Sequence, residues 1–154
     1  MNLKKVDLYT DGACSQNGTW IGGYGAVLLY GQYKKEISGF KDNTTNNQME
    51  ILAVIEGLKA LKEKVDLTIY TDSAYVCNAF ENNWVGSWQN NGWKNSQNKP
   101  VSNKELWLEL ISLLRNHNVK WVKVKGHADN EYNNRCDFLA TEQIKIRTKE
   151  LDVQ

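Results

Sequence analysis

Alternating apolar and polar residues at positions 6–12 predict a β-strand that leads to Asp11. The apolar positions carry β-branched and aromatic side chains, which are typical of a half-buried strand. Gly12 would permit a sharp exit, so we expect Asp11 where the strand passes into a loop. The pattern returns at 67–73, where Tyr70-Thr71-Asp72 precedes a serine. One Asp-Gly pair is often only a turn, but two copies would place two carboxylates at two strand ends.

Hydrophobic periodicity predicts the remaining elements. After a loop at 12–23, two strands at 24–30 and 32–40, joined by a tight turn at Gly31, complete an antiparallel meander. Apolar stripes predict helices at 48–61, 73–80, 104–116 and 132–151, and two further strands fall at 66–71 and 119–124. Helical connections favour parallel pairing of the central strands. We therefore predict an α/β fold whose five-stranded mixed sheet, a meander plus parallel strands, has helices on both faces.

Length and composition predict one domain, residues 1–154, with a distinct internal segment. The net charge is +1, from 19 basic and 18 acidic residues, so bulk charge does not drive binding to nucleic acid. The segment at 82–103, called the protrusion below, is rich in tryptophan, asparagine and glutamine. Three scattered cysteines suggest reduced thiols and a cytoplasmic location. No apolar run approaches the roughly 18 residues that would span a bilayer, so we expect no membrane association.

Four acidic residues are the candidates for chemistry: Asp11, Glu50, Asp72 and Asp137. Each lies at a predicted strand end or helix start, where elements converge at one edge of a sheet. Clustered carboxylates repel one another, and a divalent cation relieves that cost. Oxygen ligands without histidine or cysteine favour Mg²⁺ or Mn²⁺, and such sites commonly serve chemistry at phosphate. For Glu50 the alternative stays open, because Asn47 and Glu50 have the spacing of a capping box.

Five ordered motifs resemble those of type 1 ribonucleases H, and the match runs through essentially the whole chain. They are Tyr9-Thr10-Asp11-Gly12, Thr45-Asn46-Asn47-Gln48-Met49-Glu50, Tyr70-Thr71-Asp72-Ser73, Val124-Lys125-Gly126-His127 and Asn133-Asn134-Arg135-Cys136-Asp137. The resemblance implies a ribonuclease H-like fold and Mg²⁺-dependent hydrolysis of the RNA strand of an RNA:DNA hybrid, with two ions per site. The implied products carry 5′-phosphate and 3′-hydroxyl ends.

The resemblance also assigns roles to individual residues. Asp11, Glu50, Asp72 and Asp137 match the family's metal ligands, and His127 matches a loop histidine that assists proton transfer or product release. The implied substrate contacts are Asn17, Asn46 and Gln48 for the hybrid, Thr45 and Asn103 for a DNA-phosphate pocket, and Trp84 for a DNA sugar. Alternatives remain for these residues: a turn or cap for the asparagines, core packing for Trp84.

The sequence also departs from the family pattern. The loop after Asp11 has Gln16-Asn17-Gly18-Thr19-Trp20 in place of the family's usual proline-glycine run, and between Asp72 and Pro100 only Lys94 and Lys99 are basic. Because each neutralised phosphate adds affinity, we expect weaker binding of the hybrid than in relatives with a basic protrusion. Two other functions stay open: a DNA nuclease of the resolvase or integrase kind, and a non-catalytic hybrid-binding module. We expect a monomer in each case.

Overall fold

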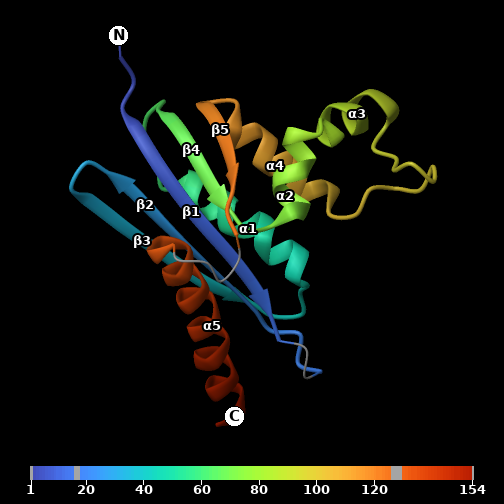
Figure 1. Cartoon of the computed structure of the whole chain (residues 1–154). Helices are drawn as coiled ribbons and strands as arrows, with labels where there is room; N and C mark the ends of the chain where they lie inside the picture. The colour runs from blue at the N-terminus through green and yellow to red at the C-terminus, as the bar shows by residue number, and fades with distance from the viewer. Residues whose placement is uncertain (1, 16–17, 126–129, 154) are drawn as a thin grey trace.

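The computed structural model describes residues 2–15, 18–125 and 130–153. The strands form one five-stranded sheet, and Figure 1 shows them side by side with helices on the two sides of the sheet. The elements in chain order are β1 (Lys5–Cys14), β2 (Gly22–Tyr30), β3 (Tyr33–Lys41), α1 (Asn46–Lys59), β4 (Asp66–Thr71), α2 (Ala74–Glu81), α3 (Trp84–Asn91), α4 (Lys104–Leu114), β5 (Asn118–Lys123) and α5 (Glu131–Asp152).

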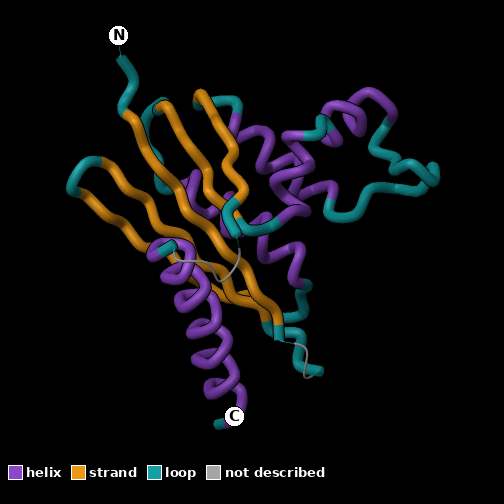
Figure 2. Tube along the Cα trace, viewed as in Figure 1, coloured by secondary structure: helices purple, strands orange, loops and turns teal. Residues whose placement is uncertain are grey.

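The sheet is mixed, as predicted, and its strand order is β3-β2-β1-β4-β5 (Figure 2). β1 pairs antiparallel with β2, and β2 pairs antiparallel with β3. β4 pairs parallel with both β1 and β5, because a helical segment precedes β4 and another precedes β5. The strand that carries Asp11 is therefore central, with the strand that leads to Asp72 as its parallel neighbour.

Helices cover both faces of the sheet, which confirms the predicted architecture. α1 packs on β1 and β2 and against α4, while α5 packs on β2, β1 and β3; Figure 1 shows these two helices on opposite sides. The core between the sheet and α1 contains Leu8, Ile51, Ile55, Ile69 and Trp107, none of which has exposed surface. Burial of these apolar side chains holds the central strands against α1, and so fixes the backbone that carries the acidic residues.

The predicted end of β1 at Gly12 is wrong. The strand continues to Cys14, which pairs with Gly22, and Asp11 pairs with Gly25 inside the ladder. Gly12 serves close packing: a Cβ atom there would lie 2.4 Å from the carbonyl carbon of Met49 in α1. The parallel pairing with β4 does stop one residue earlier, at Thr10. Asp11 is thus the first residue of β1 beyond its pairing with β4, although β1 itself goes on.

The capping interpretation of Glu50 is also wrong. α1 begins at Asn46, and its N-cap is Thr45, whose Oγ1 accepts a hydrogen bond from the Gln48 amide at 3.2 Å. Asn103 occupies the N-cap position of α4, as expected, but its side chain makes no capping bond. Glu50 therefore lies beyond the first turn of α1, and its carboxylate is free for another role.

The remaining expectations concern thiols and membranes. The three cysteines are free thiols, two of them buried. Within the described ranges, none of the helices has the length and apolar character needed to cross a bilayer.

Candidate active site

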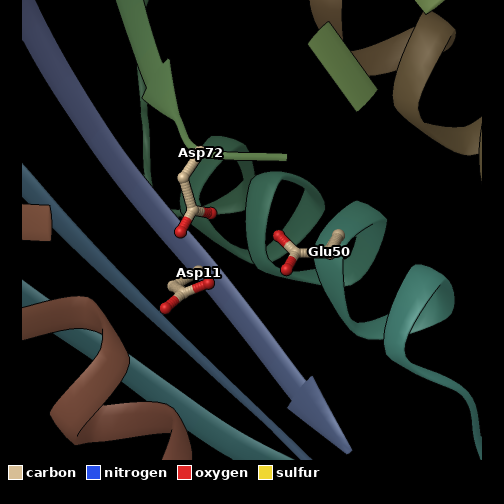
Figure 3. A group of neighbouring side chains, drawn as sticks. All are labelled: Asp11, Glu50 and Asp72. Carbon is tan, nitrogen blue, oxygen red and sulfur yellow. The ribbon is translucent and has the colours of Figure 1, made fainter. Parts of the chain in front are cut away.

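Three carboxylates meet where β1, β4 and α1 converge. Asp11 projects from β1, Glu50 from α1, and Asp72 from the residue after β4 (Figure 3). One oxygen of each carboxylate lies within 4.8 Å of the others. Asp11 and Glu50 are buried and Asp72 is half-buried, so the group has one side open to solvent. The structure thus brings together three of the four acidic residues that the sequence predicted.

Glycine at position 12 lets Glu50 come close to Asp11. A Cβ atom on Gly12 would lie 2.5 Å from the Glu50 amide nitrogen as well as 2.4 Å from Met49, both inside any real contact distance. A side chain at this position would therefore push the second turn of α1 away from β1. The absence of a Cβ atom allows the backbone approach that places the two carboxylates together.

The fourth acidic residue, Asp137, reaches the cluster from the opposite face. A Cβ atom on Gly25 of β2 would lie 2.4 Å from the Cys136 carbonyl oxygen of α5. The backbones of α5 and β2 are therefore in direct contact. Arg135 and Glu36 form a two-point ion pair, with one contact at 3.0 Å, that joins α5 to β3. Asp137 is half-buried in the second turn of α5, rather than at the helix start. The charge of Asp137 raises the pKa of Asp11. Asp137 is nevertheless not part of the group of three carboxylates that lie within 4.8 Å of one another.

Burial and mutual repulsion raise the pKa values of the two buried carboxyls. The pKa of Asp11 rises to about 8, first through burial and then through the charges of Asp72 and Asp137. The pKa of Glu50 rises to about 9, through burial and then through Asp11 and Asp72. One hydrogen bond opposes the change at Asp11, where the Gly12 amide donates to Oδ1 at 2.9 Å. The cluster consequently favours either bound protons or a bound cation.

The donor set fits a divalent metal ion. Glu50 Oε2 is buried and has no hydrogen-bond partner within the described part of the chain, although buried polar atoms are normally paired. Carboxylate oxygens are hard ligands of the type preferred by Mg²⁺ and Mn²⁺. A cation between Asp11, Glu50 and Asp72 would satisfy the unpaired oxygen and cancel the repulsion. The residues present therefore fit a metal site.

Two predicted substrate residues, Gln48 and Asn103, belong to one row of hydrogen-bonded side chains beside this cluster. The Gln48 side-chain amide donates to Asn103 Oδ1 at 3.2 Å, and the Asn103 amide donates to the Tyr75 hydroxyl at 3.1 Å. At the other end of the row, the buried Thr44 hydroxyl donates to Gln48 Oε1 at 2.7 Å. The row joins α1, α4 and α2, which are far apart in sequence. Thr44 and Tyr75 were missed, because no local pattern distinguishes them from ordinary turn and helix residues.

The other predicted contacts have separate positions. Thr45 is the N-cap of α1, and Asn46 is exposed in its first turn. Trp84 begins α3 within the protrusion and is 40% exposed, so core packing does not account for it. Asn17 and His127 lie outside the described residues. Trp107 is buried in the core, and Trp121 packs against it.

The carboxylates cluster where β1, the end of β4 and α1 meet on a mixed sheet. This arrangement defines a class of α/β proteins that have an acidic centre suited to binding metal at the sheet. Comparison with known proteins gives the family. The ribonuclease H family model matches residues 3–145. The chain is 59% identical to a ribonuclease H of a Thermoanaerobacter species over 149 residues, which cover 97% of this chain and 96% of that one. It is 56% identical to the ribonuclease H of Acetivibrio thermocellus over 147 residues, 96% of this chain and 99% of that one.

Solved structures agree with these sequence matches. LC9-RNase H1, described as a type 1 RNase H with the type 2 active-site motif, superposes with a TM-score of 0.81 at 26% identity, over 92% of this chain and 72% of that one. A foamy viral protease-reverse transcriptase in complex with an RNA/DNA hybrid gives a TM-score of 0.75 at 25% identity, over 91% of this chain and 20% of that much longer one. The chain belongs to the ribonuclease H family.

Proposed function

We propose that this protein is an endoribonuclease that hydrolyses the RNA strand of RNA:DNA hybrids with divalent metal ions, leaving 5′-phosphate and 3′-hydroxyl ends. The observation that carries the proposal is the group of three carboxylates within 4.8 Å, with a buried, unpaired Glu50 oxygen. Relatives that share more than half of its residues are named ribonuclease H. The foamy viral enzyme of similar fold binds an RNA/DNA hybrid.

Asp11, Glu50, Asp72 and Asp137 would hold two Mg²⁺ ions, or Mn²⁺ in their place. When bound, such ions supply positive charge to the attacking and leaving oxygens of the scissile phosphate. Asp11 on β1 and Asp72 after β4 would hold the ions, and Asp137 would be a further ligand of one of them. Glu50 would bind one ion and also position groups near the 2′-hydroxyl of the RNA.

Recognition of the hybrid would depend on residues around the acidic cluster. An RNA strand presents 2′-hydroxyls across a wide minor groove, and polar side chains can read them there. Asn17, Asn46 and Gln48 would contact the hybrid in this groove. Thr45 and Asn103 would hold a phosphate of the DNA strand, and Trp84 would pack on a DNA sugar. The hydrogen bond between Gln48 and Asn103 supports this arrangement, because it fixes two of these side chains relative to each other.

His127 would assist proton transfer or the release of product. Imidazole side chains in general exchange protons close to neutral pH, which suits either role. We further propose that the protein acts as a monomer and a single domain in the cytoplasm, with the hybrid as its partner.

Cleavage assays on labelled duplexes test the function. Incubation with Mg²⁺ should cut the RNA strand of an RNA:DNA hybrid and leave RNA:RNA and DNA:DNA controls intact. Asp11→Asn should abolish turnover, whereas Asp7→Asn, the same change on the same strand outside the cluster, should not. Cutting of DNA:DNA would favour a resolvase or integrase activity. Binding of the hybrid without any cleavage would indicate a non-catalytic module.

A further inference from the structure

Trp20 is an exposed tryptophan that the core does not use. Of the six tryptophans, Trp88, Trp93, Trp107 and Trp121 pack in or against the core. Trp20 and Trp84 are instead 51% and 40% exposed. Trp84 already has a proposed role in substrate binding, whereas Trp20 has none. Single exposed apolar residues are common on protein surfaces, so the case for a role of Trp20 depends on its backbone and its neighbours.

The backbone of Trp20 is strained. Its φ is +53°, in the left-handed region that bulky residues rarely adopt and that glycine adopts freely. Two features hold this conformation: the Trp20 carbonyl accepts a hydrogen bond from the Thr44 amide at 3.0 Å, and the next residue, Ile21, is buried. Strained residues of this kind cluster at functional sites, where the surroundings enforce them.

The same hydrogen bond places Trp20 at the end of the polar row. The Thr44 amide donates to the Trp20 carbonyl, and the Thr44 hydroxyl donates to the Gln48 side chain. The Gln48 side-chain amide in turn donates to Asn103. The exposed ring therefore lies at the Thr44 end of the residues proposed to contact the duplex. Trp20 precedes Gly25, the partner of Asp11, by five residues, which span up to about 17 Å at the rise of a strand. At about 3.4 Å per nucleotide, this separation corresponds to up to about five nucleotides.

We propose that Trp20 is a second aromatic contact for the duplex, packing on backbone sugars up to about five nucleotides from the scissile phosphate. This inference rests on the proposed function and adds a residue to the same site. Bases inside a duplex are covered, so the ring would meet the sugar faces that line the minor groove. The contact also offsets the scarcity of charge in the protrusion, which has only Lys94 and Lys99 as cations. Apolar packing and phosphate neutralisation are independent sources of affinity.

Steady-state cleavage of hybrids by matched variants tests this role. Trp20→Ala should raise KM about 5- to 50-fold, in the range of aromatic contacts with nucleic acid, and leave kcat within twofold. Trp20→Phe should recover most of the loss. Tyr33→Ala, which removes a side chain that is 76% exposed at the far hairpin, should match the wild type. Trp20→Gly should be at least as stable as the wild type in urea, because glycine accepts the positive φ, yet show the same rise in KM.

Hybrids shortened from either end of the RNA separate a local contact from a general effect. The rise in KM caused by Trp20→Ala should disappear when the duplex on one side of the scissile bond is shortened to fewer than about three base pairs. Shortening the other side should leave the rise in KM unchanged. An unchanged KM for Trp20→Ala and Trp20→Gly overturns the inference, as does a penalty that is equal on all truncated hybrids. A wild-type protein that does not cleave hybrids at all would instead refute the proposed function, before any variant is compared.

Discussion

Replacement of Asp11 by asparagine should stabilise the metal-free protein while it abolishes activity. Asp11 is 6% exposed, and its carboxyl faces the charges of Asp72 and Asp137. Asparagine has nearly the same shape and keeps the Oδ1 atom that accepts the Gly12 amide. The variant therefore removes an ionisable group that folding forces to hold a proton or a buried charge, and it keeps the hydrogen bond from Gly12.

The magnitude follows from the raised pKa. The unfolded chain releases the Asp11 proton near the ordinary aspartate pKa of 3.8, whereas the folded protein keeps it up to a pKa of about 8. At pH 7 this difference covers about three pKa units, which is ~4 kcal/mol at 1.36 kcal/mol per unit. A proton on the neighbouring Glu50 relieves part of the repulsion, so we expect a gain of about 2 kcal/mol, or roughly 4–8 °C in Tm for a chain of this size.

The sign of the pH dependence is fixed by the direction of the shift. A carboxyl whose pKa is raised on folding binds its proton more tightly in the folded state, so the contribution of Asp11 to metal-free stability is greatest below about pH 4 and falls as pH rises toward 8. The advantage of Asp11→Asn should therefore shrink as the pH is lowered from 7 to 5.

Urea unfolding in EDTA, followed by circular dichroism at both pH values, measures this difference. Asp7→Asn is the matched control and should show no such gain. Addition of Mg²⁺ should stabilise the wild type more than the variant, because the folded state binds the ion. A loss of stability in Asp11→Asn, or a gain that is the same at pH 5 and pH 7, would refute the electrostatic account.

Three further predictions concern packing and binding. Gly12→Ala should destabilise the protein by about 3 kcal/mol or more and abolish cleavage, because its Cβ atom would lie 2.4 Å from α1; Gly31→Ala, at an open turn with φ of +57°, should cost only about 1–2 kcal/mol and keep activity. Asn103→Gly keeps the left-handed backbone but loses the bonds to Gln48 and Tyr75, so KM should rise with kcat nearly unchanged in cleavage assays. Gln97→Lys in the exposed protrusion should tighten binding of the hybrid at low salt and steepen the dependence of log K on log salt by about 0.9; an unchanged slope in fluorescence anisotropy would show that the protrusion does not reach the phosphates.

The local patterns of the sequence determined most of the elements. Period-two alternation placed β4 at 66–71 with its observed bounds, and apolar stripes found α1, α2, α4 and α5 within a few residues of their ends. These elements follow from local rules, since alternation and helical stripes reflect which face of each element is buried. The helical connections predicted parallel pairing of the central strands, and the structure confirms this for β4 with β1 and β5. The four acidic residues were likewise found from their places near the ends of elements.

The tertiary structure decided what surrounds those residues. The sequence pattern predicted a turn at Gly12, but β1 continues to Cys14 in its pairing with β2. Close packing of Gly12 against Met49 brings Glu50 to Asp11. Thr45, rather than Asn47, caps α1, so the Glu50 carboxylate does not bond the start of its helix, and its Oε2 atom is unpaired within the described residues. These outcomes depend on the distance between backbones that are remote in sequence, and local propensity holds no information about that distance. The sequence therefore determined which groups could act, and packing decided how close together they are.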